Sequence, residues 1–362
     1  MPNETKFHFL EKLLSDEERE TIRRATVPGR FHPLAVLLDG QGNQFLAANT
    51  ERALGWVTRR DERWLKALKK RLLETATLTE PAAALAELRA YGALLEAGFH
   101  VSPFAADASG PKPEFKVRLN DEEMVVEVHS KQYDAAMARE IEKFHEVSPK
   151  ESSAPTTSDP KPKVEVRVLD VQPFGRPRPG KPHDTTTTNA ISKICRIKAD
   201  EHQLTEGMPS LLWLDFQDAQ NLSMALTGEH LSPVMSWQGF VNSGVLWYAL
   251  YGWKGAPVFE RHCLLVPFST RTIVPMQHDG RFRLSQKLSA VVFSFPNATL
   301  LAESFRATAP ISDTFRRHFP YLPWAQVSTS IINWLPDQVK GTISLQARSI
   351  CTMAGEPYYP PD

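Results

Sequence analysis

Residues 78–131 constrain the fold most, because one helix-forming run is followed there by three short strand-forming runs. The first run, LTEPAAALAELRAYGALLEAGFHV, has leucines at helical spacing among alanines, which is typical of a helix packed flat on a sheet. Thr79 is expected to cap this helix, Pro81 suits its first turn, and Gly98 suits the left-handed residue that ends it. The strands are expected at 99–104, 114–119 and 124–131, the last two joined by a hairpin turn. The pattern therefore predicts an α/β protein built around this unit.

The segments on either side are expected to add helices first and strands later. Residues 1–77 contain two amphipathic runs, separated by turn residues around Asp39-Gly40 that predict a small hairpin. A second core helix is expected to begin with Asn189 as its cap, followed by a buried strand over 210–216. Further strands are expected at 164–171, 244–252, 263–268 and 288–295.

We expect three regions in the chain. Residues 1–77 form a helical N-terminal subdomain, 78–216 form the core, and 217–362 form an α/β extension packed on that core. Pro, Ser and Thr are frequent at the start of 147–188, so this stretch is expected to be a mobile insertion in the core. The aromatic residues within 237–253 are expected to be buried, although they could also stack on bases.

The balance of charge excludes a protein that is basic over its whole surface. Lys plus Arg number 42 and Asp plus Glu also number 42, so nucleic acid would have to bind at a local patch. The three cysteines lie far apart, which argues against a disulfide framework. No apolar run is long enough to span a membrane, and no signal-like segment begins the chain. We therefore expect a cytoplasmic protein without membrane attachment.

A local excess of positive charge occurs between residues 160 and 199, where nine basic residues stand against three acidic ones. Lys and Arg side chains that neutralise phosphates supply most of the non-specific affinity for nucleic acid. A solvated basic loop without a partner is the alternative. The residues predicted to contact nucleic acid are Arg167, Arg176, Arg178, Lys181, Lys193, Arg196 and Lys198.

Glu127, His129 and Lys131 alternate along one predicted strand, so their side chains point to the same face. Glu114 begins the preceding strand, which the hairpin is expected to place beside Glu127. Mg²⁺ or Mn²⁺ binds a few hard oxygen ligands and can promote the hydrolysis of a phosphodiester. The predicted metal ligands are the carboxylates of Glu114 and Glu127 and the carbonyl of Val128. The other predicted catalytic residues are Glu87, which would orient a water, and His129 or Lys131 as the cationic or proton-transferring group.

This arrangement resembles the PD-(D/E)XK, or restriction-endonuclease-like, nucleases over 79–131 and more loosely over 189–216. The resemblance implies an αβββαβ core with a mixed central sheet, divalent metal ions, and nucleic acid, in the first place DNA, as the partner. Glu87 matches the family's acidic helix residue, and Glu114 matches the aspartate that follows a proline. Glu127 and Val128 match the carboxylate and the X of the (D/E)XK motif.

Two positions depart from the family pattern. Glu114 replaces an aspartate, and His129 stands where the family has its lysine. Lys131 lies two residues further along the same face, roughly 6.6 Å away at the rise of a strand. The lysine could act only by reaching back along the sheet.

Three hypotheses therefore stay open at the level of the sequence. The first is a metal-dependent endonuclease in restriction, defence or repair. The second is a degenerate nuclease fold that binds nucleic acid or a partner protein without cutting. The third is a small-molecule enzyme or interaction protein in which the acidic strand is only surface. A homodimer or a complex with a partner protein is compatible with the sequence in each case. Separation of Glu114 and Glu127 on opposite sheet faces would leave only the third.

Overall fold

The computed structural model describes residues 7–26, 31–38, 44–104, 112–133, 135–146, 168–204, 206–217, 231–237, 240–260, 266–267, 273–326, 336–355 and 357–358. The helices are α1 (His8–Leu13), α2 (Asp16–Ala25), α3 (Pro33–Leu38), α4 (Gln44–Arg60), α5 (Glu62–Leu72), α6 (Thr79–Glu96), α7 (Ala135–Glu146), α8 (Thr186–Arg196), α10 (Val245–Tyr251), α11 (Arg281–Leu284), α12 (Asp313–His318), η3 (Phe319–Tyr321) and α13 (Pro336–Ala354). The strands are β1 (His100–Pro103), β2 (Phe115–Leu119), β3 (Glu122–Ser130), β4 (Ser210–Asp215), β5 (Met235–Trp237), β6 (Phe240–Asn242), β7 (Pro257–Phe259), β8 (Val266–Pro267), β9 (Ile273–Pro275), β10 (Ala290–Phe295), β11 (Ala298–Glu303) and β12 (Ala325–Gln326).

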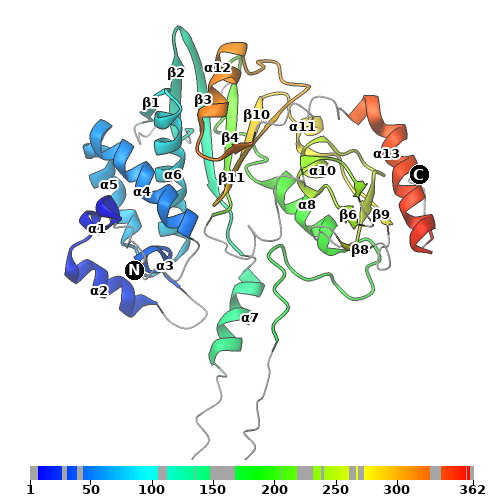
Figure 1. Ribbon diagram of the computed structural model, residues 1–362, viewed down its shortest axis with the longest axis horizontal. Helices are drawn as coiled ribbons and strands as arrows, with labels where there is room; N and C mark the ends of the chain where they lie inside the picture. Colours follow the sequence, from blue (N-terminus) through cyan, green and yellow to red (C-terminus); the bar gives the residue numbers. More distant parts are fainter. Residues whose placement is uncertain are drawn as a thin grey trace, which may run out of the picture.

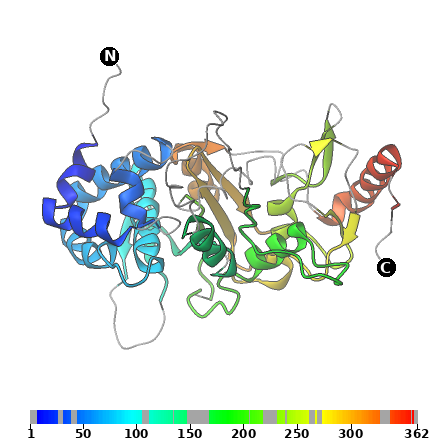
Figure 2. The ribbon, with the colours of Figure 1, turned by 90° about the horizontal axis from the view of Figure 1, so that it is seen from below.

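A mixed sheet forms the centre of the molecule, and the described residues contribute seven strands to it in the order β1-β2-β3-β4-β10-β11-β12. The first three strands are antiparallel, whereas β4 runs parallel to both β3 and β10. Helices α1–α6 cover one face of the sheet, and α8, α10, α11 and α13 lie on the other side (Figures 1 and 2). The chain is thus an α/β protein, as expected from its sequence.

The helical side of the core is organised by α6, which is buried almost all round because the sheet lies beneath it and α4 and α5 pack over it. Val126 and Val128 of β3 point into this core. Successive side chains of a strand point to opposite faces, so the residues between and after them, Glu127 and His129, face the α8 layer instead. The register with the following strand pairs Glu127 with Leu212.

The second core lies on the α8 side and surrounds α10, all seven residues of which are buried. The prediction of a strand over 244–252 is therefore wrong, because a continuous apolar run fits a fully buried helix as well as a strand. Trp247, Tyr248, Tyr251 and Trp253 lie in this core, so the expectation of buried aromatic residues is confirmed for them.

The hairpin predicted around Asp39-Gly40 is also wrong, because helices α3 and α4 flank residues 39–43, which lie outside the described part. Apolar side chains at helical spacing on α4 pack against α6. This tertiary packing outweighs the preference of the local residues for a hairpin turn. The strand expected over 164–171 is absent from its described residues, and Val168 there is 86% exposed.

Two predicted helix caps also differ from the structure. Thr79 is the first residue of α6 rather than its cap, and no side chain caps that end. Helix α8 begins three residues before Asn189, since Thr185 accepts a hydrogen bond from the Thr188 N–H in a capping box. Gly98, with φ of 87°, ends α6 as predicted.

The predicted core strands are confirmed with small shifts at their ends, as are the helix and strand expected after the insertion. Cys195 and Cys351 are buried and free, and Cys263 lies outside the described residues. Among the described helices, none combines the length and the apolar composition needed to cross a bilayer.

Candidate functional site

Glu114, Glu127 and Lys198 form a compact charged cluster on the α8 side of the sheet. Glu127 is completely buried in the middle of β3, and Glu114 lies just before β2 on the neighbouring strand. The ammonium of Lys198, which follows α8, makes an ion pair with the Oε1 atom of Glu127. The structure therefore brings together the two carboxylates singled out in the sequence and adds a lysine from a distant segment.

The backbone of β3 helps to hold this cluster. The Val128 N–H donates a hydrogen bond of 2.7 Å to Oε2 of Glu114. The N–H and carbonyl of a strand residue point to the same side, so the carbonyl of Val128 also faces the segment that carries Glu114. Three hard oxygen groups predicted as metal ligands thus border one small region.

The two carboxyl groups share an environment that disfavours two negative charges. Burial, and then the charge of Glu127, raise the pKa of Glu114 to about 9, although the Val128 N–H opposes this shift. Burial also raises the pKa of Glu127, despite the opposing effect of Lys198 and Glu114. Near neutral pH the pair therefore retains a proton when no further cation is present.

Lys198 is held in place by residues from two later segments. Its φ of 51° is a left-handed conformation, and the buried Arg281 of α11 donates a hydrogen bond of 2.9 Å to its carbonyl. Its ammonium also donates to Oε1 of Gln203 at 2.7 Å. Burial alone would lower the pKa of Lys198, but the ion pair with Glu127 and the charges of Glu114 and Asp200 together outweigh burial and raise it. The lysine is therefore a fixed cation.

His129 and Lys131 differ from each other in charge and in contacts. Burial, and then the positive charges of Lys198 and Lys131, lower the pKa of His129 to about 4, so the imidazole is neutral at pH 7. The ammonium of Lys131 donates to the Gln132 carbonyl and lies 5.5 Å from the centre of the Phe174 ring. His129 is therefore better suited to accept a proton than to act as a cation.

Glu87 lies on α6 and is bound by an arginine that the sequence did not single out. Arg71 of α5 contacts both carboxylate oxygens of Glu87, at 2.7 and 2.9 Å. The charge of Glu87 contributes to the raised pKa values of Glu114 and Glu127, which places it within electrostatic reach of the pair. No local motif marks Arg71 or Arg281 as part of the site, because both reach it through tertiary packing.

The residues predicted to contact nucleic acid separate into two groups. Lys198 belongs to the carboxylate cluster, and Arg167 lies outside the described residues. The remaining ones line two cavities on either flank of α8 and comprise Arg176, Arg178, Lys181, Lys193 and Arg196.

The donor atoms of the cluster fit a hard divalent cation in part. Oε1 of the buried Glu127 carboxylate is paired with Lys198, and Oε2 has no hydrogen bond of normal geometry to the described residues, so Oε2 is the oxygen available to a cation. Within the described residues, no group of three or more His, Cys, Asp or Glu side chains is arranged to hold a metal ion. Mg²⁺ keeps several of its waters and needs few protein ligands, so two carboxylates and a carbonyl are chemically suitable.

No family model, curated protein or solved structure matches this chain. The functional interpretation of the cluster rests on the residues that form it.

Proposed function

We propose that the protein is a metal-dependent endonuclease that hydrolyses phosphodiester bonds in DNA, with a restriction-endonuclease-like core. The observation that carries the proposal is that Glu114 and Glu127, from neighbouring strands, meet Lys198, which follows α8. A pair of buried carboxylates beside a fixed ammonium is suited to a bound cation and to a phosphate that develops negative charge.

The order of elements supports this proposal. Helix α6, strands β1–β3, helix α8 and strand β4 occur in the order αβββαβ, with helix α7 inserted between β3 and α8, and β4 joins the antiparallel β1–β3 group in parallel to β3. This is the order that the resemblance to the PD-(D/E)XK nucleases implies for the core. Glu127 lies on the third strand and Glu114 immediately precedes the second, which are the places that the resemblance implies.

Each residue of the cluster has a distinct part in the proposed reaction. Glu114 and Glu127 would hold Mg²⁺ or Mn²⁺ with the Val128 carbonyl, and a bound ion supplies Lewis acidity toward a phosphoryl oxygen. Lys198 provides positive charge next to the reacting phosphate, in the role that the family gives to the lysine replaced here by His129. The neutral imidazole of His129 can accept a proton.

The test is cutting of supercoiled plasmid and single-stranded DNA in Mg²⁺, in Mn²⁺ and in EDTA. Glu127→Gln removes a metal-binding charge with little change in size, and we expect it to lower cutting at least about a hundredfold. Glu123→Gln is the matched control, since Glu123 is on the same strand but pairs with Lys116 at the surface. Cutting that persists in EDTA or in Glu127→Gln would contradict the proposal.

Separate variants test which lysine supplies the positive charge beside the reacting phosphate. Lys198→Ala is expected to lower cutting about tenfold to a hundredfold while DNA binding is retained, and Lys198→Arg to restore part of it. Lys131→Ala should have a smaller effect, because its ammonium is directed to Gln132 and Phe174. The reverse order would assign the role to Lys131.

The alternative function is a nuclease fold that binds nucleic acid or a partner protein without cutting. The observation that favours it is the absence of a charged group at His129 combined with the ion pair that already neutralises Glu127. DNA binding by the wild-type protein and by Glu127→Gln, with cutting by neither, would support this alternative.

A further inference from the structure

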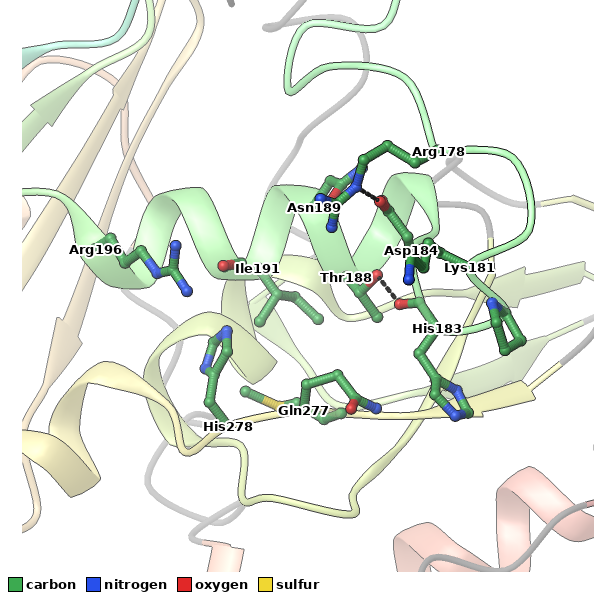
Figure 3. A pocket seen from close by; sticks show the side chains of 13 residues that line it. Arg178, Lys181, His183, Asp184, Thr188, Asn189, Ile191, Arg196, Gln277 and His278 are labelled. Carbon is green, nitrogen blue, oxygen red and sulfur yellow. Dashed lines mark hydrogen bonds and ion pairs between the residues drawn. The ribbon is translucent and has the colours of Figure 1, made fainter.

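A second concave site lies on the flank of α8, separate from the carboxylate cluster. Its cavity of about 290 Å³ is bordered by the segment before α8, by the outer side of α8 and by residues 276–278. Figure 3 shows Arg196 and His278 toward one end, and Lys181 and His183 toward the other. Helix α8 is about 16 Å long, so the two ends are separated by much of the length of the helix.

Positive charge gathers around this cavity without matching negative charge. Three cationic side chains, Arg178, Lys181 and Arg196, border it together with one carboxylate, Asp184. Asp184 is already paired with Arg178. Within the described part of the chain, the side chains of Lys181 and Arg196 make no ion pair or hydrogen bond. A bound anion would therefore gain a favourable electrostatic interaction with a cation that no described carboxylate neutralises.

The walls of the cavity are fixed by hydrogen bonds. The Thr188 hydroxyl donates to the His183 carbonyl at 2.8 Å and joins the preceding segment to α8, as Figure 3 shows. On the opposite wall, Met276 exchanges backbone hydrogen bonds with the segment 255–256, each of 2.8 Å. A cavity whose walls are fixed before binding loses little free energy in ordering itself around a ligand.

We propose that this cavity binds a small phosphate ester, with Lys181 as the group that recognises its phosphate at one end and Arg196 as a contact to the rest of the ligand at the other end. The first N–H groups of α8 are not the recognition element, because Thr185 caps the Thr188 N–H and Glu260 accepts from the Thr187 N–H.

The size of the cavity distinguishes a small ligand from a nucleic-acid duplex. A volume of about 290 Å³ is near the lower limit for small-molecule sites. A duplex needs an open groove that follows its backbone, whereas this site is bounded by two chain segments and a helix. The inference is independent of the proposed nuclease activity, because no residue of the carboxylate cluster borders the cavity.

The test is isothermal titration of the full chain with inorganic phosphate, adenosine 5′-monophosphate, adenosine and a single-stranded oligonucleotide. We expect saturable binding of phosphate and of the monophosphate but not of adenosine. Lys181→Ala should weaken binding of phosphate and of the monophosphate roughly tenfold or more, whereas Arg196→Ala should weaken binding of the monophosphate but not of phosphate. Lys193→Ala is the matched control, because Lys193 lies on α8 but borders the other cavity.

Two results would overturn the proposal. One is no saturable binding of phosphate or of the monophosphate by the folded wild-type chain. The other is equal weakening by Lys181→Ala, Arg196→Ala and Lys193→Ala with binding confined to the oligonucleotide, which would make the cavity part of a general nucleic-acid surface. Glu127→Gln should bind the monophosphate like the wild type, so loss of cutting and loss of this site are separable.

Discussion

At the residue scale, the chemistry of the site follows from the burial of Glu127. A carboxylate removed from water beside a second carboxyl group must share a proton or contact a cation. Here Lys198 contacts Glu127 and the raised pKa of Glu114 retains the proton, so the cluster is balanced before any ion or substrate binds. A divalent cation would therefore compete with the Lys198 ammonium and with the proton that the carboxyl pair retains. Its binding should release protons near neutral pH.

His32 provides a pH-dependent contribution to stability outside the site. Its ring is completely buried, and the Leu34 N–H donates to Nδ1 at 3.2 Å, so Nε2 carries the proton and donates to the Glu74 carbonyl at 3.0 Å. Burial lowers the pKa of His32. The unfolded chain therefore binds more protons than the folded one as the pH falls below about 6.5, and stability decreases there.

We expect His32→Gln to remove this part of the pH dependence. Urea unfolding of the wild type and the variant between about pH 5.5 and 7.5 measures it, since the difference between their free energies of unfolding isolates the His32 contribution. His202→Gln, which replaces an exposed side chain, should keep the wild-type dependence. A difference between wild type and His32→Gln that does not change with pH would contradict the assignment.

At the element scale, the sequence was sufficient to predict the helices and strands of the core, but not the contacts between them. The leucine and alanine spacing of α6 and the alternation of β3 are local patterns, and both elements form where they were predicted. The placement of Lys198 depends instead on the packing of α8 and on a hydrogen bond from Arg281, 83 residues further along the chain. No local pattern encodes such contacts. For the same reason, the fully buried α10 could not be distinguished from a strand.

The crossing of α4 and α6 supplies a prediction about close packing. A Cβ atom added at Gly92 of α6 would lie 2.3 Å from the Cα of Ala53, so Gly92→Ala forces the helices apart and should destabilise the protein by about 1–3 kcal/mol. At Gly341 of α13, no atom of the described residues lies within 4 Å of the same position, and Gly341→Ala should stabilise the protein by about 0.5–1 kcal/mol. Urea unfolding of both variants measures the two effects. If both variants changed the free energy of unfolding equally and in the same direction, the α4–α6 contact would not be tight.

At the scale of the whole molecule, one sheet belongs to both cores. Strand β4 directs Leu211 and Trp213 to the α6 side and Leu212 and Leu214 to the α10 side. A buried ion pair, with Arg89 contacting Asp215 at 3.0 and 2.9 Å, joins α6 to the end of the same strand. Loss of either partner would leave an uncompensated buried charge, at a cost of about 3–5 kcal/mol. The α6 layer and the α10 layer therefore pack on opposite faces of the same strands, and the stability of each depends on those strands.

The last prediction concerns cooperativity between the layers. Leu250→Ala in α10 deletes a buried side chain and should cost about 2–5 kcal/mol. Because β4 and β10 serve both cores, hydrogen exchange under mild denaturant should show equal loss of protection in α10 and in α6, on the far side of the sheet. Leu94→Ala in α6 is the reciprocal variant and should affect α10 in the same way. Loss of protection confined to the mutated layer would instead mean that residues 217–362, the C-terminal region expected from the sequence, unfold as a separate unit.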